Sequence, residues 1–292
     1  MACKATDKRV EYKTKMTALM SELTFGIEIE QVGIGRYSDS NCLRAINEMF
    51  VGRERWKQVS DSSIRGGNGS EFVSGIMKWS SLSNVQEAIR LIKSHGGRTH
   101  DSCGVHVHID GSRFLRDPKA LVRLCKLVHK YEDHIYHSVK SDNRNSQHNG
   151  WSKSMCPRFL ERLEALKNPT IDDIRLAWYQ NDWGHRERYN NTRYRLLNLH
   201  ALFSKGTIEF RCFNSTLHAG KAKSYIQLCG LIVCEALLKT RASSKKRPFN
   251  QEKGKYEVRT FLLRLGAIGE EFSTLRFHAQ KGLKGSSAKH VG

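Results

Sequence analysis

The chain has 292 residues, of which 39% are hydrophobic and 27% charged, and its 49 Lys and Arg against 29 Asp and Glu give a formal net charge of +20. Its longest apolar stretch, residues 228–238, is too short to span a bilayer and contains Glu235, and its charged N-terminus lacks the apolar core of a signal peptide. Eight cysteines without a CxxC pair argue against a zinc ribbon and a disulfide scaffold, so we expect a cytoplasmic globular protein with no membrane partner.

The predicted secondary structure interleaves strands and helices. In chain order we expect a strand at 24–33, a helix at 40–50, two short strands around a Gly-rich turn within 56–77, a helix at 83–97, a strand at 103–110, a helix at 117–139, a polar loop at 141–156, a helix at 170–180, paired strands within 191–217, and helices at 218–240 and 254–265. This order lacks regular βαβ units, so we expect an α+β fold rather than a doubly wound parallel sheet.

Local signals mark the ends of two of these helices. Ser83 and Gln86 have the spacing of a capping box, and Gly96–Gly97 follow the last turn of the same helix. In the helix at 117–139, Asp117 is the expected N-cap and the residue after it is a proline, which suits a first helical turn. Both helices therefore have defined starting points in the sequence.

The excess positive charge is spread along the chain, with clusters in residues 4–15, 245–255 and 281–289. Two explanations remain open. The charge serves solubility and attracts anions of the size of ATP, or it binds a polyanionic partner such as nucleic acid or an acidic polymer. No helix-turn-helix, RRM or zinc-finger pattern supports sequence-specific recognition of nucleic acid.

The first predicted strand carries two acids on one face. Its apolar residues point to one side and Glu28 and Glu30 to the other, because strand side chains alternate. Two carboxylates at this spacing lie about 6.6 Å apart, and at an effective dielectric of about 20 they repel each other by roughly 2 kcal/mol. Something else in the protein must offset this repulsion.

Two later strands show the same anomaly. One of them places His106, His108 and Asp110 on a single face. The other does the same with Glu209 and Arg211. A solvated face of an antiparallel sheet can also be polar, but such faces usually show Lys, Thr, Gln and Ser. Acids, histidines and an arginine instead favour a common ligand-binding face.

A divalent cation would explain the acids. Mg²⁺ and Mn²⁺ take oxygen ligands with an occasional imidazole, and a bound ion turns the repulsion between Glu28 and Glu30 into attraction. Glu71, in a strand-like run after the Gly-rich turn, is a further candidate ligand. Arg211 fits beside such a site if an anion, such as a phosphoryl group, lies between it and the metal. These residues indicate phosphoryl chemistry rather than a simple zinc hydrolase.

Five motifs occur in order along the chain: FGIEIE (25–30), DSSI followed by GSEFVS (61–74), CGVHVHID (103–110), RYRLLNL (193–199) and GTIEFRCFNSTL (206–217). In order and spacing they resemble the amidoligase family, relatives of glutamine synthetase and glutamate–cysteine ligase in the carboxylate–amine ligase superfamily. The resemblance begins near residue 22. It implies a single catalytic domain over 22–292, preceded by a basic N-terminal extension over 1–21.

The resemblance implies a curved antiparallel sheet that forms a funnel, with helices packed on its outer face. ATP and two or three Mg²⁺ ions, or Mn²⁺ in their place, would lie inside the funnel. Glu28 and Glu30 would hold different ions, and Glu71 would complete one of the sites. His106 and Glu209 would join Glu28 around the ion nearest the γ-phosphate.

Further roles follow from the same resemblance. Arg211 would contact the transferred phosphoryl group. The strand before Glu209 and Arg211, which form the family's ExR motif, would contact phosphate or substrate. The catalytic candidates are Arg211, Glu209 and Arg193. The candidates for binding nucleotide or substrate, or for supporting the metal ligands, are His108, Tyr194, Asn198 and Asp61.

The implied reaction joins a carboxylate to an amine through an acyl phosphate made from ATP. Water has to be kept away from that intermediate, and the polar loop at 141–156, which contains Trp151, is the candidate lid. The sequence leaves the carboxylate and the amine open among small molecules, peptides and proteins. Two alternatives from other classes are a metal-dependent hydrolase and a non-catalytic protein that binds nucleic acid.

Overall fold

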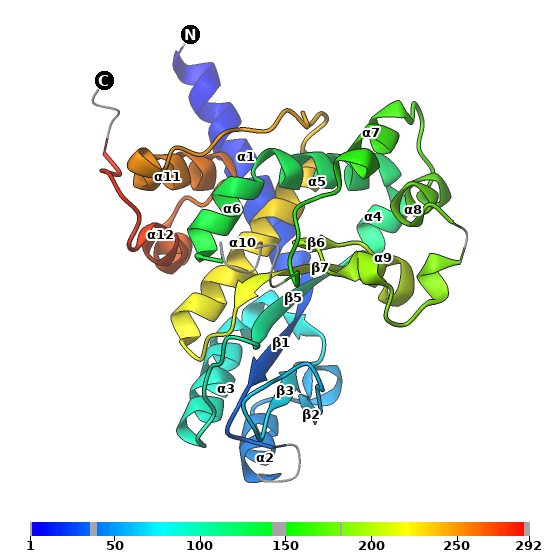
Figure 1. Cartoon of the computed structure of the whole chain (residues 1–292). Helices are drawn as coiled ribbons and strands as arrows, with labels where there is room; N and C mark the ends of the chain where they lie inside the picture. The colour runs from blue at the N-terminus through cyan, green and yellow to red at the C-terminus, as the bar shows by residue number, and fades with distance from the viewer. Residues whose placement is uncertain (1, 36–39, 142–149, 182, 289–292) are drawn as a thin grey trace.

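A seven-stranded antiparallel sheet forms the centre of the structure (Figure 1). The computed structural model describes residues 2–35, 40–141, 150–181 and 183–288. The sheet is open, with the order β2-β3-β1-β5-β7-β6 and with β4 paired to β1, which confirms the α+β class. The strands are β1 (Thr24–Gln31), β2 (Lys57–Val59), β3 (Ser70–Val73), β4 (Met77–Lys78), β5 (Gly104–Asp110), β6 (Leu197–Asn198) and β7 (Thr207–Asn214).

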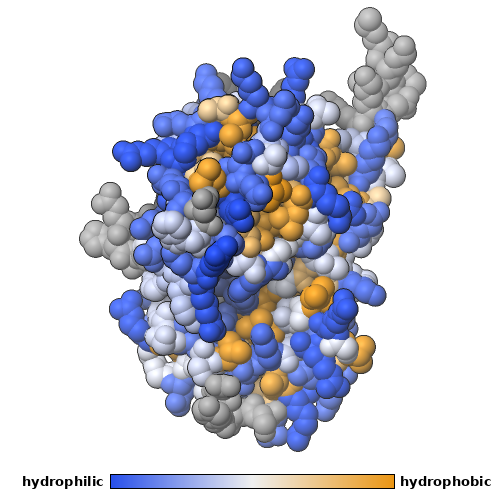
Figure 2. Space-filling model, turned by 90° about the vertical axis from the view of Figure 1, so that its right-hand side faces the viewer, coloured by the Kyte–Doolittle hydropathy of each residue, from blue (hydrophilic) through white to orange (hydrophobic). Residues whose placement is uncertain are grey.

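Helices surround the sheet, and the long helix α10 packs against β5 as well as α1, α3, α5 and α12 (Figure 1). The helices are α1 (Ala2–Glu22), α2 (Ser40–Asn47), α3 (Leu82–Ser94), α4 (Ser112–Arg116), α5 (Pro118–Lys130), α6 (Glu132–Val139), α7 (Pro157–Ala165), α8 (Ile171–Tyr179), α9 (His200–Lys205), α10 (Ala219–Leu238), α11 (Gly254–Arg264) and α12 (Ser273–Gln280). Within the described ranges, no helix has both the length and the apolar character to cross a membrane. Hydrophilic side chains dominate the face shown in Figure 2.

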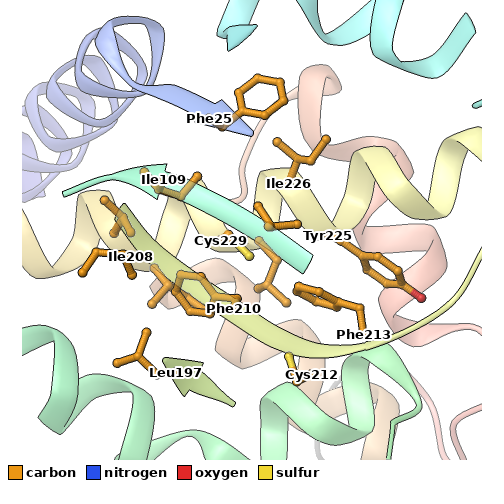
Figure 3. Close-up of a cluster of buried hydrophobic side chains, with 14 of the residues drawn as sticks. Phe25, Ile109, Leu197, Ile208, Phe210, Cys212, Phe213, Tyr225, Ile226 and Cys229 are labelled. Atoms are coloured by element: carbon orange, nitrogen blue, oxygen red, sulfur yellow. The ribbon is translucent and has the colours of Figure 1, made fainter. Parts of the chain in front are cut away.

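The apolar faces of β1, β5 and β7 form the core together with α10 (Figure 3). Phe25, Ile109 and Ile208, one from each strand, are buried beside Ile226 and Cys229 of α10. Because strand side chains alternate, the other face of the sheet carries the ionisable residues. The predicted separation of apolar and ionisable faces is confirmed, and it is what positions the site.

The structure divides the long helix that the sequence predicts into two. The helix expected at 117–139 breaks at Tyr131 into α5 and α6, and after the break the buried Glu132 accepts a hydrogen bond from the Met155 N–H. Its N-terminus agrees with the prediction, because the Asp117 side chain accepts from the Ala120 N–H at 3.0 Å. The break coincides with a side-chain contact to another segment, which local periodicity does not reveal.

The capping box predicted from Ser83 and Gln86 is wrong. Helix α3 begins at Leu82, one residue earlier, and its N-cap Ser81 makes no capping hydrogen bond. The Ser81 hydroxyl instead donates to Glu54 Oε1 at 2.7 Å, so a tertiary contact replaces the local one.

Helix α9 separates the paired strands expected within 191–217. The chain leaves α9 through Gly206, whose φ of +77° is strained for a residue with a side chain, and then enters β7. The Gly206 carbonyl accepts from the Gly111 N–H at 2.9 Å, which ties this turn to the end of β5. The turn therefore fixes the start of the strand that carries the ExR motif.

Helix α1 packs against α10 along its second half. Met16 and Met20 are buried, and the Tyr12 hydroxyl donates to Glu235 of α10. The helices approach closely because α10 has Gly230 here: a Cβ at that position would lie 3.2 Å from Met20 Cε. The division between an extension at 1–21 and a domain at 22–292 stays a prediction.

This packing predicts a stability effect. We expect Met20→Ala to lower the free energy of unfolding by about 3 kcal/mol, because it leaves a cavity between α1 and α10. Val10→Ala on the same helix is the matched control: Val10 is 60% exposed against 2% for Met20, so its change is expected to stay within about 0.5 kcal/mol. Urea unfolding followed by circular dichroism measures both, and equal losses would contradict the packing of α1.

Candidate active site

A cavity of about 770 Å³ opens on the ionisable face of the sheet. Residues of β1, β2, β3, β5, β6, β7 and α9 line it, together with residues between these elements that are far apart in the sequence. Every predicted site residue except His108 lines this cavity: Glu28, Glu30, Asp61, Glu71, His106, Arg193, Tyr194, Asn198, Glu209 and Arg211. The pattern read from isolated strands therefore corresponds to one place in the fold.

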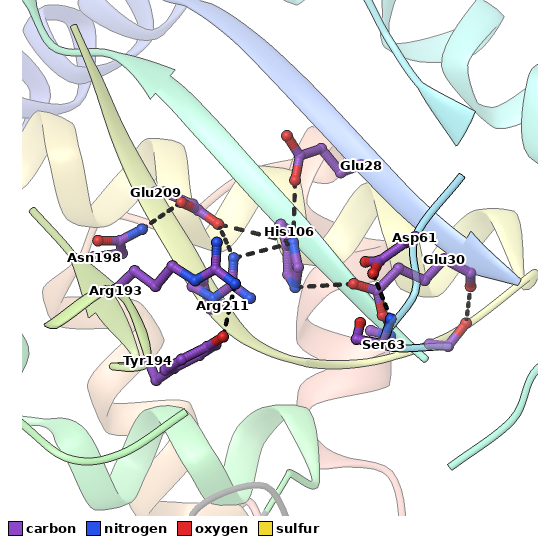
Figure 4. Close-up of polar contacts among 12 residues, drawn as sticks. Glu28, Glu30, Asp61, Ser63, His106, Arg193, Tyr194, Asn198, Glu209 and Arg211 are labelled. Atoms are coloured by element: carbon purple, nitrogen blue, oxygen red, sulfur yellow. Dashed lines mark hydrogen bonds and ion pairs between the residues drawn. The ribbon is translucent and has the colours of Figure 1, made fainter. Parts of the chain in front are cut away.

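Glu28, His106 and Glu209 meet at the centre of the cavity (Figure 4). Glu28 in β1 lies opposite His106 in β5, and the His106 Nδ1 atom is 3.1 Å from Glu28 Oε2 and 3.8 Å from Glu209 Oε1. One ligand atom from each of the three residues lies within 4.8 Å of the others. This spacing suits a single cation held by two carboxylates and an imidazole.

A second group, Glu30, Glu71 and His106, has the same spacing of ligand atoms. Glu30 in β1 and Glu71 in β3 are register partners, and Glu30 Oε1 lies 3.7 Å from His106 Nε2. The other Glu30 oxygen accepts a hydrogen bond from the Gly104 N–H at 2.5 Å, which fixes the carboxylate. Two carboxylate sets therefore share one histidine.

The chemistry of imidazole limits how His106 can serve both sets. A neutral imidazole has one acceptor nitrogen, so it donates a lone pair to only one cation. Its Nδ1 faces Glu28 and Glu209, whereas its buried Nε2 has no hydrogen-bond partner in the described part of the chain. The residues therefore fit two divalent cations, with His106 as a ligand of one and Glu30 and Glu71 as the carboxylates of the other.

Electrostatics keep Glu28 and Glu209 ionised despite their burial. Burial opposes the charged form of Glu28, but the charges and hydrogen bonds of His108 and His106 outweigh it and hold its pKa well below the usual range. Burial also acts against Glu209, yet Arg211 and the two histidines lower its pKa to about 2. Both carboxylates are thus charged and able to ligate a cation at neutral pH.

Glu71 behaves in the opposite way. Burial, followed by the charges of Glu28 and Glu30, raises its pKa to about 10. Three carboxylates that face one another cannot all be ionised at low cost unless a cation lies between them. Burial is the larger cause of the raised pKa, and repulsion from Glu28 and Glu30 adds to it.

Arg211 reaches this centre from an irregular part of β7. The pairing of β5 with β7 shifts register between Val105 and Val107, so β7 carries an extra residue next to Arg211. Arg211 Nη1 donates to Glu209 Oε1 at 2.6 Å and lies 3.5 Å from His106 Nδ1. Alternation from Glu209 thus keeps the guanidinium on the cavity face, and the β-bulge changes the face only of the residues after it.

Two arginine donors in the cavity remain unused. The Nε atoms of Arg193 and Arg211 are buried and have no hydrogen-bond partner among the described residues. Arg193 Nη2 donates to the Tyr194 hydroxyl at 2.6 Å, which holds the side chain in place. Buried N–H groups require acceptors, so an anion in the cavity would satisfy both.

A wall of alternating arginine and tyrosine side chains leads from Arg211 to the mouth of the cavity. The Arg211 guanidinium lies 5.9 Å from the Tyr194 ring centre, and Arg193 lies between Tyr194 and Tyr189 at 4.7 and 5.0 Å. Arg188 continues the series at 5.1 Å from Tyr189. We did not predict Arg188 and Tyr189 from the sequence, although alternating basic and aromatic residues in the segment 185–195 were a visible signal.

Asn198 and Asp61 occupy different parts of the cavity. Asn198 Nδ2 donates to Glu209 Oε2 at 2.5 Å and so orients that carboxylate. Asp61 lies on the side of Glu71, and its Oδ1 accepts from the Ser63 N–H at 2.8 Å. Asn198 therefore supports a ligand, whereas Asp61 presents a second carboxylate oxygen to the cavity.

His108 does not line the cavity, although it contacts residues that do. Its Nε2 lies 3.2 Å from Glu28 Oε1 and 3.9 Å from Glu209 Oε1, and its Nδ1 lies 2.9 Å from Thr207 Oγ1. Burial opposes its protonation, but the charges of Glu28 and Glu209 prevail and raise its pKa. Of the two predicted roles, support of the metal ligands fits this position better than contact with nucleotide or substrate.

Part of the candidate lid is visible. Trp151 lines the cavity and meets the Tyr194 ring edge-on, with ring centres 5.3 Å apart. Residues 142–149, the middle of the segment predicted as a lid, lie outside the described residues. The lid stays a prediction.

Comparisons with known proteins identify a family and a structure with a similar fold. A family model described as "Putative amidoligase enzyme" matches residues 21–233. The comparison with curated proteins found no match. Among solved structures, the chain is similar to the crystal structure of a bifunctional glutathione synthetase from Pasteurella multocida, with a TM-score of 0.50 and 12% sequence identity over 93% of this chain and 48% of that one. The chain thus spans about half the length of that protein, and the likeness concerns the fold.

Proposed function

The chain belongs to the amidoligase family, and from this we propose that it is an ATP- and Mg²⁺-dependent ligase that joins a carboxylate to an amine. The observation that carries the proposal is the meeting of two carboxylate sets with two unused arginine donors in one cavity. Carboxylates are the usual protein ligands of Mg²⁺, and arginine is suited to phosphoryl oxygens. Neither group has an evident use in a site that binds only neutral molecules.

In the proposed enzyme each carboxylate set holds one ion. Glu28, His106 and Glu209 would bind the first, and Glu30 with Glu71 the second. Mn²⁺ suits the same ligands. When bound, these ions would neutralise the charge of the phosphates. We further propose that the open, curved sheet is the wall of a glutamine synthetase-like funnel around the nucleotide.

The arginines act on the anions. Arg211 and Arg193 would donate their free Nε–H groups to oxygens of the transferred phosphoryl group and of the substrate. A carboxylate oxygen attacks the γ-phosphorus and ADP leaves, which gives an acyl phosphate. The amine nitrogen then attacks the acyl carbon, and inorganic phosphate leaves. Trp151 and Tyr194 at the cavity wall would keep water from the acyl phosphate.

Three expectations from the sequence concern features other than the cavity: a nucleic-acid partner, the location in the cell and the domain bounds. A nucleic-acid partner follows only from the net charge of +20, and neither the fold nor the family supports it. We retain the cytoplasmic location and the single catalytic domain at 22–292 as proposals.

The proposal is tested by a screen for ADP production with Mg²⁺ and ATP present, in which carboxylates and amines are added singly and in pairs. We expect ADP release that needs both substrates, and mass spectrometry should find a product lighter by one water than their sum. A metal-dependent hydrolase would instead turn over its substrate without nucleotide. Calorimetry that detects no Mg²⁺-dependent binding of ATP to folded protein would refute the proposal.

The arginine–tyrosine wall predicts a smaller effect at the mouth of the cavity. We expect Arg188→Gln to raise the KM for the anionic substrates by roughly threefold to tenfold with little change in kcat, because its exposed cation attracts the substrate without touching the reacting atoms. Arg186→Gln is the matched control, since Arg186 is also exposed but does not line the cavity. The difference should shrink as salt is added, and a fall in kcat alone would contradict the role in attraction.

A further inference from the structure

A second cavity, of about 160 Å³, lies where the C-terminus of α6, the end of β7, the first half of α10 and α12 come together. Helix α12 packs against both α6 and α10, and the three helices lie near one another in Figure 1. None of the residues that line this cavity also lines the candidate active site. It is a separate cavity that contains none of the residues proposed to bind metal, nucleotide or substrate.

Three lysines from three segments converge on this cavity. Lys140 follows α6, Lys221 lies in the first turn of α10, and Lys281 follows α12. No aspartate or glutamate is among the lining residues, and none of the three ammonium groups forms an ion pair within the described part of the chain. The cavity therefore collects positive charge with no negative charge to balance it.

Lys140 lies close enough to Lys221 and Lys281 for their charges to act on it. Partial burial, followed by the charges of Lys221 and Lys281, lowers the pKa of Lys140. Lys140 also adopts a left-handed conformation, with φ at +56°, and its carbonyl accepts a hydrogen bond from Asn214 Nδ2 at 2.9 Å. This hydrogen bond links the left-handed turn after α6 to the end of β7.

His278 adds an unsatisfied polar atom to the wall. Its Nδ1 is buried and has no hydrogen-bond partner among the described residues. Its Nε2 is pressed against the start of α10, where a Cβ at Gly220 would lie only 2.8 Å away. The His218 side chain caps this helix end by accepting from the Gly220 and Lys221 N–H groups at 3.1 and 3.3 Å. The wall therefore adds an unsatisfied ring nitrogen to the positive charge of the lysines.

We propose that this cavity is an anion site that binds a phosphate group, either free or as the monoester of a small molecule. A doubly charged oxyanion would convert the repulsion among Lys140, Lys221 and Lys281 into attraction, and its several oxygens would accept from all three. The volume suits a single phosphate group, because pockets that enclose whole drug-sized ligands measure about 300–1,000 Å³. Any organic part of the ligand would remain in solvent.

The test is calorimetric titration with inorganic phosphate and, separately, with phenyl phosphate, at constant ionic strength. The variant is Lys221→Gln/Lys281→Gln, and the matched control is Lys119→Gln/Lys167→Gln, which removes two exposed charges that do not line the cavity. We expect saturable binding that weakens by roughly tenfold or more in the variant and is unchanged in the control. Thermal unfolding confirms that all proteins are folded.

Repeating the titration with Arg211→Ala separates this site from the active site. We expect phosphate binding at the second cavity to persist in that protein. Binding of both ligands would identify the phosphate group of a larger molecule as the ligand, whereas binding of inorganic phosphate alone would identify the free anion. Equal weakening in the variant and its control, loss of all binding with Arg211→Ala, or no saturable binding would each overturn the proposal.

Discussion

Glu209→Gln is expected to abolish amine-dependent ADP release, with a loss of about a thousandfold or more, while the protein stays folded. Glu209 contacts three other residues that line the cavity. Its Oε1 accepts from Arg211, its Oε2 accepts from Asn198, and it faces His106 across the proposed cation site. The amide is nearly the same size but carries no charge, so it weakens metal binding and leaves Arg211 without its carboxylate partner.

A buried glutamate elsewhere provides the control for this substitution. Glu235 on α10 is 4% exposed, against 3% for Glu209, and it pairs with Tyr12 and Lys239 instead of cavity residues. Glu235→Gln should therefore retain activity. Steady-state ADP release and Mg²⁺ calorimetry on both proteins measure the contrast, and wild-type turnover in Glu209→Gln would show that the site is assigned wrongly.

The second large effect is expected at Arg211. Arg211→Ala should lower kcat by roughly a thousandfold or more, because the donor proposed for the phosphoryl group is lost. Arg211→Lys restores the positive charge beside Glu209 but lacks the fork and the free Nε–H, so it should recover stability more fully than activity. Thermal unfolding and single-turnover kinetics separate the two contributions.

Arg123 is the matched control for Arg211. The two side chains are similarly buried, at 15% and 13% exposure, but Arg123 binds Asp117 and the Ala236 carbonyl outside the active-site cavity. Arg123→Ala is expected to reduce stability and to leave kcat nearly unchanged. If both alanine variants lost activity in proportion to their stability, Arg211 would have only a structural role.

The sequence alone predicted the features that depend on the alternation of side chains along a strand. Period-two patterning in three strands identified which residues share a face, and Glu28, His106 and Glu209 do converge there. Charge repulsion between Glu28 and Glu30 also indicated the site, and in the folded chain burial, followed by the charges of these two residues, raises the pKa of Glu71. Predictions of this kind hold in the folded protein because the direction of a strand side chain depends on the local backbone geometry.

Features that depend on contacts between distant segments were not predictable in this way. The β-bulge beside Arg211 comes from a register shift against β5, and it brings Phe213 round to stack on Tyr225 of α10 at 4.3 Å, where strict alternation would place it on the cavity face. The break at Tyr131 and the packing of α1 likewise follow from tertiary contacts. Arg188 and Tyr189 were missed because they lie outside any strand, where no periodicity marks a shared face.

The outermost strands of the sheet set a limit on how a peptide or protein could be recognised. β2 and β6 are three and two residues long, so each border exposes very few free backbone amides and carbonyls. Among the described residues, these two strands are therefore short templates for an extended chain that would dock as an additional strand. If the proposed ligase acts on a polypeptide, we expect recognition to depend more on the side chain or terminus that enters the cavity near the exposed Tyr189 than on pairing with the sheet.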